Sequence, residues 1–153
     1  LDIDTKVATE INLRIPALIP EDYLPDVHTR LIMYKRISSV QDQERLHDLQ
    51  VEMIDRFGIL PKSLKRLFQL TELKQKADSF GIKKIDSNSR FGNIYFGQQT
   101  NVDPLSIISL VQSAPNVYKL SNAHQLRFSY ESDDPDLRLG FVDNVLQQLK
   151  VVI

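Results

Sequence analysis

Four carboxylates recur along one predicted helix, and their spacing could serve a binding surface. They are Glu44, Asp48, Glu52 and Asp55. At about 100° per residue, positions i, i+4, i+8 and i+11 fall within about 80° of arc on a helix. Like charges at this spacing repel each other by about a few tenths of a kcal/mol per pair, which a cationic partner would relieve. Asp55 also stands near the helix C-terminus, where the helix dipole disfavours an acid.

This row of four carboxylates, the acidic stripe, has two readings from the residues alone. Solvated helix faces are often acidic, and Arg45 and Arg56 flank the stripe and would screen it. Alternatively, the stripe docks on a basic partner. Both readings stay open at the level of charge and spacing.

Residues that could support catalysis or metal binding do not form a recognisable motif. The histidines, His28, His47 and His124, do not stand at a metal-binding spacing. There is no glycine-rich phosphate-binding loop, and the serine pairs at 38–39 and 87–89 have no base placed by sequence. We therefore predict no catalytic residue, no metal ligand and no bound cofactor in this chain.

Clustered acids and bases elsewhere have structural explanations. Asp133, Asp134 and Asp136 could suggest a divalent cation, but an Asp-Pro helix start explains them, with Asp134 as the N-cap. A third predicted helix carries five basic residues interleaved with acids, which favours a solvated face over a nucleic-acid stripe. These basic residues are Lys62, Lys65, Arg66, Lys74 and Lys76.

Composition limits the class of protein. The chain has 153 residues, of which 42% are apolar and 25% charged, values typical of a soluble globular chain. A net charge of −1 lowers the expectation of a nucleic-acid-binding domain, although it does not exclude a local basic patch. The absence of cysteine excludes disulfides, thiolate zinc sites and a cysteine nucleophile. We expect a cytoplasmic protein with no membrane span and no signal peptide, cut from a longer chain.

The elements that position these residues follow from periodicity and capping. Residues 7–15 alternate, with Thr9 and Leu13 on the apolar side, and predict a strand. Helices are expected at 26–39, 41–58 and 62–80, with Asp26 capping the first and Gly58 ending the second. A hairpin follows at 82–97 with SNSRFG as its loop, then a helix after Asp103, a hairpin at 117–130 and a helix after Asp134.

This order predicts an α+β fold in a single domain spanning residues 1–153. One antiparallel sheet, made of the N-terminal strand and two hairpins, is expected to pack against about five helices. Apolar stripes at helical spacing predict the buried helix faces. In the first two helices, the predicted buried residues are Val27, Leu31, Tyr34, Ile37, Leu46, Leu49, Met53, Ile54 and Phe57.

Two segments resemble a known family. EINLRIPALIPEDYLPDVHTRLIMYKRIS and LQVEMIDRFGILP are similar to the C-terminal domain of bacterial transcription-repair coupling factors. LKQKADSFGIKKID resembles the third helix and following strand of the same domain. The likeness covers essentially the whole chain and is strongest over residues 9–86, whereas the hairpin loop SNSRFGN departs from the family pattern.

The resemblance implies a regulatory role inside a larger protein. The parent would be an ATP-driven DNA translocase that removes stalled RNA polymerase and recruits excision repair, with ATP and Mg²⁺ bound by its motor outside this chain. The domain would fold back on the UvrB-like N-terminal module of the same chain. This contact would mask the surface that recruits UvrA and restrain the motor. DNA would be bound through the motor, and no membrane is involved.

The family contact also assigns residues. Acids of the VEMIDRFG helix would face arginines of the UvrB-like module, which points to Glu52 and Asp55, with Arg56 adjacent; Asp48 and Glu44 extend the same face. We expect Glu52→Arg with Asp55→Arg to open the parent protein without unfolding the domain. The alternatives are a free-standing interaction or self-association domain that uses the same helix, and a small hydrolase that would need a deep polar pocket.

Overall fold

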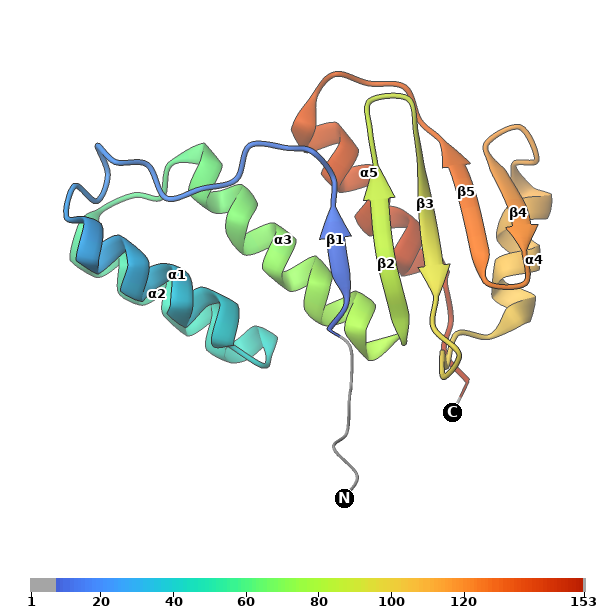
Figure 1. Cartoon of the computed structure of the whole chain (residues 1–153), viewed down its shortest axis with the longest axis horizontal. Helices are drawn as coiled ribbons and strands as arrows, with labels where there is room; N and C mark the ends of the chain where they lie inside the picture. Colours follow the sequence, from blue (N-terminus) through green and yellow to red (C-terminus); the bar gives the residue numbers. More distant parts are fainter. Residues whose placement is uncertain (1–7, 153) are drawn as a thin grey trace. The chain divides into compact units, whose positions relative to one another are not determined.

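The computed structural model describes residues 8–152 and confirms the predicted α+β class and the predicted order of elements (Figure 1). The helices are α1 (Val27–Ser39), α2 (Gln43–Phe57), α3 (Lys62–Ser79), α4 (Pro104–Ser113) and α5 (Pro135–Gln148). The strands are β1 (Glu10–Asn12), β2 (Ile82–Ser87), β3 (Phe91–Phe96), β4 (Tyr118–Asn122) and β5 (Gln125–Ser129).

The described residues form two compact units. Residues 8–14 and 76–152 make the sheet unit, which contains all five of these strands together with α4, α5 and the last turn of α3. Residues 15–75 make the helical unit, which contains α1, α2 and most of α3. The single-domain prediction for residues 1–153 stays a prediction.

The sheet is mixed, so the prediction of a wholly antiparallel sheet was wrong. The strand order is β1-β2-β3-β5-β4, and β1 pairs with β2 in parallel while the other neighbours are antiparallel. Between β1 and β2 the chain passes through three helices, and a parallel pair needs such a long crossover. Side chains alternate with a period of two in parallel and in antiparallel strands alike. The sequence pattern therefore could not distinguish the two kinds of strand pairing.

The first strand is shorter than the predicted 7–15 but has the predicted faces. Thr9 and Leu13 are buried, whereas Glu10 and Asn12 are exposed; Val7 lies outside the described residues. Beyond the paired segment, Arg14 adopts a positive φ of 53°, a conformation incompatible with a continuing strand. The buried Arg138 of α5 holds this exit by donating to the carbonyl of Leu13 at 2.9 Å.

The first hairpin is tighter than expected. Its loop is only residues 88–90, because Phe91 and Gly92, predicted in the loop, pair in β3. The side chain of Asn88 closes the turn by accepting from the amides of Arg90 at 2.8 Å and Phe91 at 2.9 Å.

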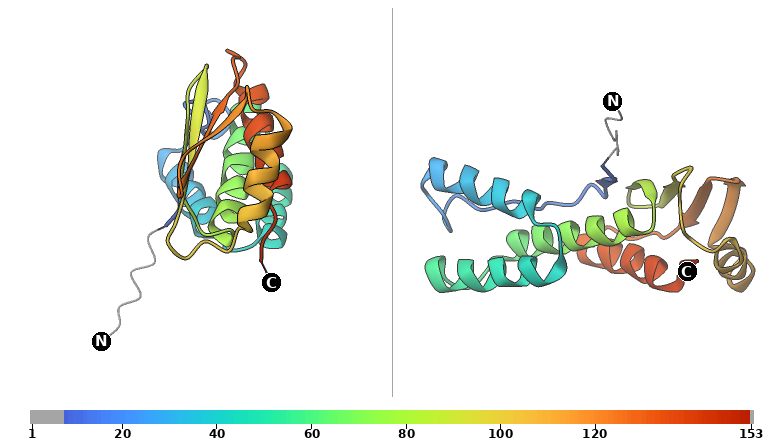
Figure 2. Two further views of the ribbon diagram at one scale, coloured as in Figure 1. Left: turned by 90° about the vertical axis from the view of Figure 1, so that its right-hand side faces the viewer. Right: turned by 90° about the horizontal axis from the view of Figure 1, so that it is seen from below.

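The core of the sheet unit lies between the sheet and helix α5, with α4 on the same side of the sheet (Figure 2). The predicted stripe of α5 is buried as expected. It consists of Leu139, Val142, Leu146 and Leu149. On the sheet side, Phe128 packs against Phe141 of α5 with ring centroids 5.2 Å apart.

The helical unit has its own core, but two predicted faces were partly wrong. Its fully buried side chains include Met33, Ile37, Met53, Leu64 and Phe68. In contrast, Val27 and Leu31 of α1 are 57% and 61% exposed, and Ile54 of α2 is 43% exposed. Helix α1 is apolar on two sides, and the packing of the unit buries only the side with Met33 and Ile37. Within residues 8–152, no helix is both long and apolar enough to cross a bilayer.

Candidate partner-binding surface

Helix α2, which carries the acidic stripe, is fixed at both ends. At its start, the side chain of Asp42 accepts from the amide of Arg45 at 2.8 Å. At its end, Gly58 has a φ of 99° and donates to the carbonyl of Ile54 at 2.9 Å. Such a backbone strongly favours glycine, as the sequence predicted. The hydroxyl of Tyr23 also donates to the carbonyl of Gly58 at 2.9 Å, which ties the helix end to the preceding segment.

The predicted division of α2 into an apolar and an acidic side is present in the structure. Leu46, Leu49 and Met53 are buried at 5% exposure or less. The opposite side carries three exposed carboxylates that make no hydrogen bond or ion pair within residues 8–152. They are Glu44, Asp48 and Asp55. These three carboxylates are therefore open to a partner.

Glu52 is different, because it is already paired inside the helical unit. Its carboxylate accepts two hydrogen bonds from the guanidinium of Arg36 on α1, with Nη2–Oε1 at 2.7 Å and a second, shorter contact from Nη1. Arg56, one turn further along α2, donates to the same carboxylate at 3.0 Å. A paired, fork-like contact of this kind is the strongest geometry for an arginine–carboxylate pair.

This pairing changes the acidity of Glu52. Hydrogen bonds from Arg36, and then from Arg56, lower the pKa of Glu52 to about 2, against an opposing effect of partial burial. The same contact raises the pKa of Arg36. Both side chains remain well exposed, at 42% for Arg36 and 36% for Glu52. Water and salt therefore screen the pair, and it is worth about 1 kcal/mol or less.

The arginines near the stripe are engaged with other groups. Arg56 lies over the ring of Phe57, with its Cζ atom 4.8 Å from the centroid, in addition to its contact with Glu52. Arg45 pairs with the N-cap carboxylate of Asp42 at 3.5 Å. Neither arginine contacts Asp48 or Asp55 directly. Arg45 therefore screens mainly Asp42, and Arg56 screens mainly Glu52.

A shallow hollow of about 370 Å³ lies between the end of α1 and the middle of α2. It is lined by Arg36, Ser39, Val40, Gln41, Arg45, Asp48, Leu49 and Glu52. A partner side chain placed there would meet carboxylates and guanidinium groups of this chain at once. The surface is therefore suited to exchange of ion pairs between this chain and a partner.

The sequence missed Arg36 as part of this surface. The residue is 16 positions before Glu52 and lies on a different helix, so no helical spacing connects the two. Only the packing of α1 on α2 brings the guanidinium to the carboxylate. The predicted role of the five assigned residues in binding a partner stays a prediction.

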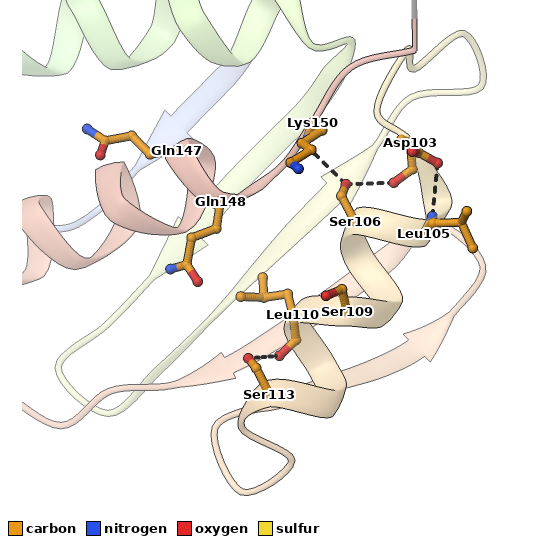
Figure 3. A pocket seen from close by; sticks show the side chains of 9 residues that line it. All are labelled: Asp103, Leu105, Ser106, Ser109, Leu110, Ser113, Gln147, Gln148 and Lys150. Atoms are coloured by element: carbon orange, nitrogen blue, oxygen red, sulfur yellow. Dashed lines mark hydrogen bonds between the residues drawn. The ribbon is translucent and has the colours of Figure 1, made fainter.

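The hydrolase alternative receives no support from a serine-lined hollow between α4 and the end of α5 (Figure 3). The hydroxyl of Ser106 donates to the carbonyl of Asp103 at 2.7 Å, and that of Ser113 donates to the carbonyl of Leu110 at 2.6 Å. The carboxylate of Asp103 caps α4 by accepting from Leu105. The lining residues include no histidine, and the hydroxyls of Ser106 and Ser113 donate to backbone carbonyls instead of to a carboxylate or a lysine side chain.

The acids at the start of α5 act as predicted for a helix start. Asp134 accepts from the amide of Asp136 at 2.9 Å and is the N-cap. Within residues 8–152, no group of three or more histidine, cysteine or acidic side chains is placed to hold a metal ion.

The family model for the TRCF domain matches residues 13–107, which include α1, α2 and α3. The chain belongs to the TRCF domain family. The sequence-based resemblance to transcription-repair coupling factors is thereby confirmed, and the match contains the whole acidic stripe of this TRCF domain.

Individual relatives agree with this assignment. A transcription-repair-coupling factor of Escherichia coli (strain K12) is 37% identical over 146 residues, which are 95% of this chain and 13% of that protein. The corresponding protein of Haemophilus influenzae is 39% identical over 145 residues, again 95% of this chain and 13% of the relative. The TRCF domain chain thus spans only about 13% of the length of these relatives.

The fold also matches a solved structure. The crystal structure of the C-terminal domain of a transcription-repair coupling factor aligns with a TM-score of 0.74 at 23% sequence identity. The alignment covers 96% of this chain and 97% of the other. At this identity the likeness establishes the fold alone.

Proposed function

We propose that this chain is a non-catalytic regulatory domain of a transcription-repair coupling factor. It docks through the outer side of α2 on the UvrB-like module of the same protein. In that closed state it masks the surface that recruits UvrA and restrains the ATP-driven translocase until stalled RNA polymerase is engaged. Contacts with polymerase, UvrA and DNA belong to the parent protein.

One observation carries the proposal: α2 presents Asp48 and Asp55 to solvent without a partner in the described part of the chain, on a helix whose ends are fixed. Exposed ion pairs are individually weak, at about 0–1 kcal/mol each. A contact within one protein benefits from a high effective concentration, so several weak pairs suffice to hold a closed state that remains reversible.

The pairing of Glu52 with Arg36 adds a competitor to this contact. An arginine of the UvrB-like module that approaches Glu52 must displace Arg36 or share the carboxylate with it. Because the Arg36–Glu52 pair is exposed, its displacement costs little. Asp55 and Asp48 therefore provide the first attachment, and Glu52 contributes by exchanging its partner.

The proposal is tested in the full-length parent protein by measuring UvrA binding in the absence of polymerase. Asp48→Arg with Asp55→Arg should raise the affinity for UvrA about fivefold or more. Coupling between two sites of a protein typically changes a binding affinity by about this factor or more. The matched control, Glu21→Arg with Glu72→Arg, makes the same charge change at exposed acids away from the α2 face. No gain over wild type, or an equal gain in the control, would contradict the proposal.

A second variant should act in the opposite direction. Arg36→Gln removes the main competitor, so an arginine of the partner module has to share Glu52 only with Arg56. We expect the parent protein to bind UvrA more weakly than wild type, because the closed state is favoured. An increase in UvrA binding by Arg36→Gln would show that Arg36 supports the contact instead of competing for it.

A further inference from the structure

The sheet unit has one face that none of its own helices covers (Figure 2). Tyr118 and Phe128 point toward Phe141 of α5, with ring centroids 6.3 and 5.2 Å away. Because side chains alternate along a strand, their neighbours Lys119 and Arg127 point to the other face. Both side chains are exposed.

We infer that this uncovered face binds single-stranded nucleic acid at the end of the sheet where β2 begins and β3 ends. This inference concerns a surface on the sheet unit and is independent of the docking function proposed for α2. It rests on strand register, a hollow, the distribution of charge and the position of aromatic rings.

The register places cationic, aromatic and amide side chains in adjacent rows across the uncovered face, with Glu10 and Asp86 at the β1–β2 end of these rows. Lys84 of β2 pairs with Tyr95 of β3, and Tyr95 pairs with Gln125 of β5. In the next row, Asn93 pairs with Arg127, and Arg127 pairs with Lys119. Side chains in one row lie close enough to contact the same ligand.

A hollow of about 670 Å³ lies at this end of the sheet. Except for Ala123, its side chains are basic, aromatic or amide. They include Lys83, Lys84, Tyr95, Asn122, His124 and Gln125. The register of β2 shifts between Ile82 and Lys84, and this irregularity places the consecutive Lys83 and Lys84 in the same hollow.

Charge is segregated along the sheet although the whole chain is nearly neutral. Strands β3, β4 and β5 contain no acidic residue. Lys84 pairs weakly with Glu10 at 3.5 Å and with Asp86 at 4.0 Å, whereas Lys83 forms no ion pair within residues 8–152. The acids at 131–136 follow the opposite end of β5. A net charge of −1 therefore conceals a local cationic site.

The aromatic rings on this face favour nucleic acid over an acidic peptide as the ligand. Tyr95 is partly exposed at the centre of the site, and its hydroxyl makes no hydrogen bond in the described part of the chain. On the same face, Arg127 covers the ring of Phe91, with its Cζ atom 4.0 Å from the centroid, and so presents a flat guanidinium. Bases of any sequence stack on such rings and planes, while flanking lysines contact the phosphates.

The experiment uses the 153-residue chain and a fluorescein-labelled (dT)12 oligonucleotide, with binding followed by anisotropy. Saturable binding should weaken with salt, with a slope in log–log form of about 0.7 per phosphate contact. Lys83→Glu should reduce affinity at least about threefold, whereas the matched control Lys74→Glu on α3 should stay within about twofold of wild type. Lys83 and Lys74 are both exposed and unpaired within residues 8–152, so both variants should fold.

Stacking is tested separately at Tyr95. Tyr95→Ala should weaken binding at least about fivefold, whereas Tyr95→Phe, which keeps the ring, should stay within about twofold of wild type. If Tyr95→Ala impairs folding, chemical shifts of the wild-type chain provide the same information, because (dT)12 should perturb amides of β2, β3 and β5.

Several results would overturn the inference. These are the absence of saturable binding, equal losses in Lys83→Glu and Lys74→Glu, and chemical-shift changes confined to α2. Displacement of the probe by a 12-residue polyglutamate peptide as effectively as by unlabelled (dT)12 would show that the face is a site for acidic peptides.

Discussion

At the scale of single residues, Glu52 is a carboxylate on an exposed helix face that is already neutralised by its own chain. Arg36 approaches it from α1 and Arg56 from the next turn of α2. Asp55, three residues later, has no such contact within residues 8–152. A cationic partner can therefore pair directly with Asp55, whereas at Glu52 it must displace Arg36 and Arg56 or share the carboxylate with them.

The lowered pKa of Glu52 predicts a pH dependence of stability. Its folded pKa is about 2, below the ordinary value of 4.5, so the charged form is favoured by folding. The stabilisation should be complete above pH 4.5 and should disappear as the pH falls toward 2. Because the pair is exposed, we expect about 1 kcal/mol or less between wild type and Glu52→Gln at pH 7.

Urea unfolding of wild type and Glu52→Gln at pH 7, 4 and 3 measures this difference, and it should shrink progressively in the two acidic samples. A carbon-13 titration of the Glu52 carboxyl gives its midpoint directly. A midpoint at the ordinary glutamate value, or a stability difference that does not change with pH, would show that the Arg36 contact does not persist in solution.

At the scale of elements, glycines at helix ends and within helices should respond oppositely to the same substitution. Gly81 follows α3 with a φ of 71°, and an added Cβ would lie 2.7 Å from the Cα atom of Thr100. Gly140 lies inside α5, where an added Cβ meets nothing within 4 Å. Gly81→Ala therefore combines backbone strain with a clash against backbone, whereas Gly140→Ala gains helix propensity.

We expect Gly140→Ala to stabilise the chain by about 0.5–1 kcal/mol and Gly81→Ala to destabilise it by more than about 1 kcal/mol. Thermal unfolding of the two variants beside wild type measures both effects in the same unit of the fold. Equal effects of the two substitutions would mean that the backbone at Gly81 relaxes to accept a side chain.

At the scale of the whole molecule, the two proposed surfaces belong to different compact units. The outer side of α2 lies in residues 15–75, and the cationic end of the sheet lies in the other unit. Substitutions that share no contacts should act independently. Asp55→Arg should therefore leave (dT)12 binding within about twofold of wild type, and Lys83→Glu should leave UvrA binding by the parent protein unchanged.

The measurement is a cross-comparison of both variants in both assays. A change of (dT)12 affinity in Asp55→Arg well beyond that range would show that the two surfaces are coupled. Failure of one proposal in its own assay leaves the other intact, because different residues in different units carry them.

Much of this fold could be predicted from local pattern. The N-caps Asp26, Asp103 and Asp134, and the helix end at Gly58, depend on groups within a few residues of each other, and all four are where the sequence predicts them. The same is true of the acidic stripe, because a helix fixes which residues share a side.

By itself, the sequence determined the class of the fold, the order of its elements, the membership of a family and the acids on the outside of α2. Tertiary structure alone decided that Arg36 neutralises Glu52, that β1 runs parallel to β2, and that Lys83, Tyr95 and His124 line one hollow. The physical reason is that each of these contacts joins segments distant in the chain, whose meeting depends on packing and strand register and leaves no periodic trace in the sequence.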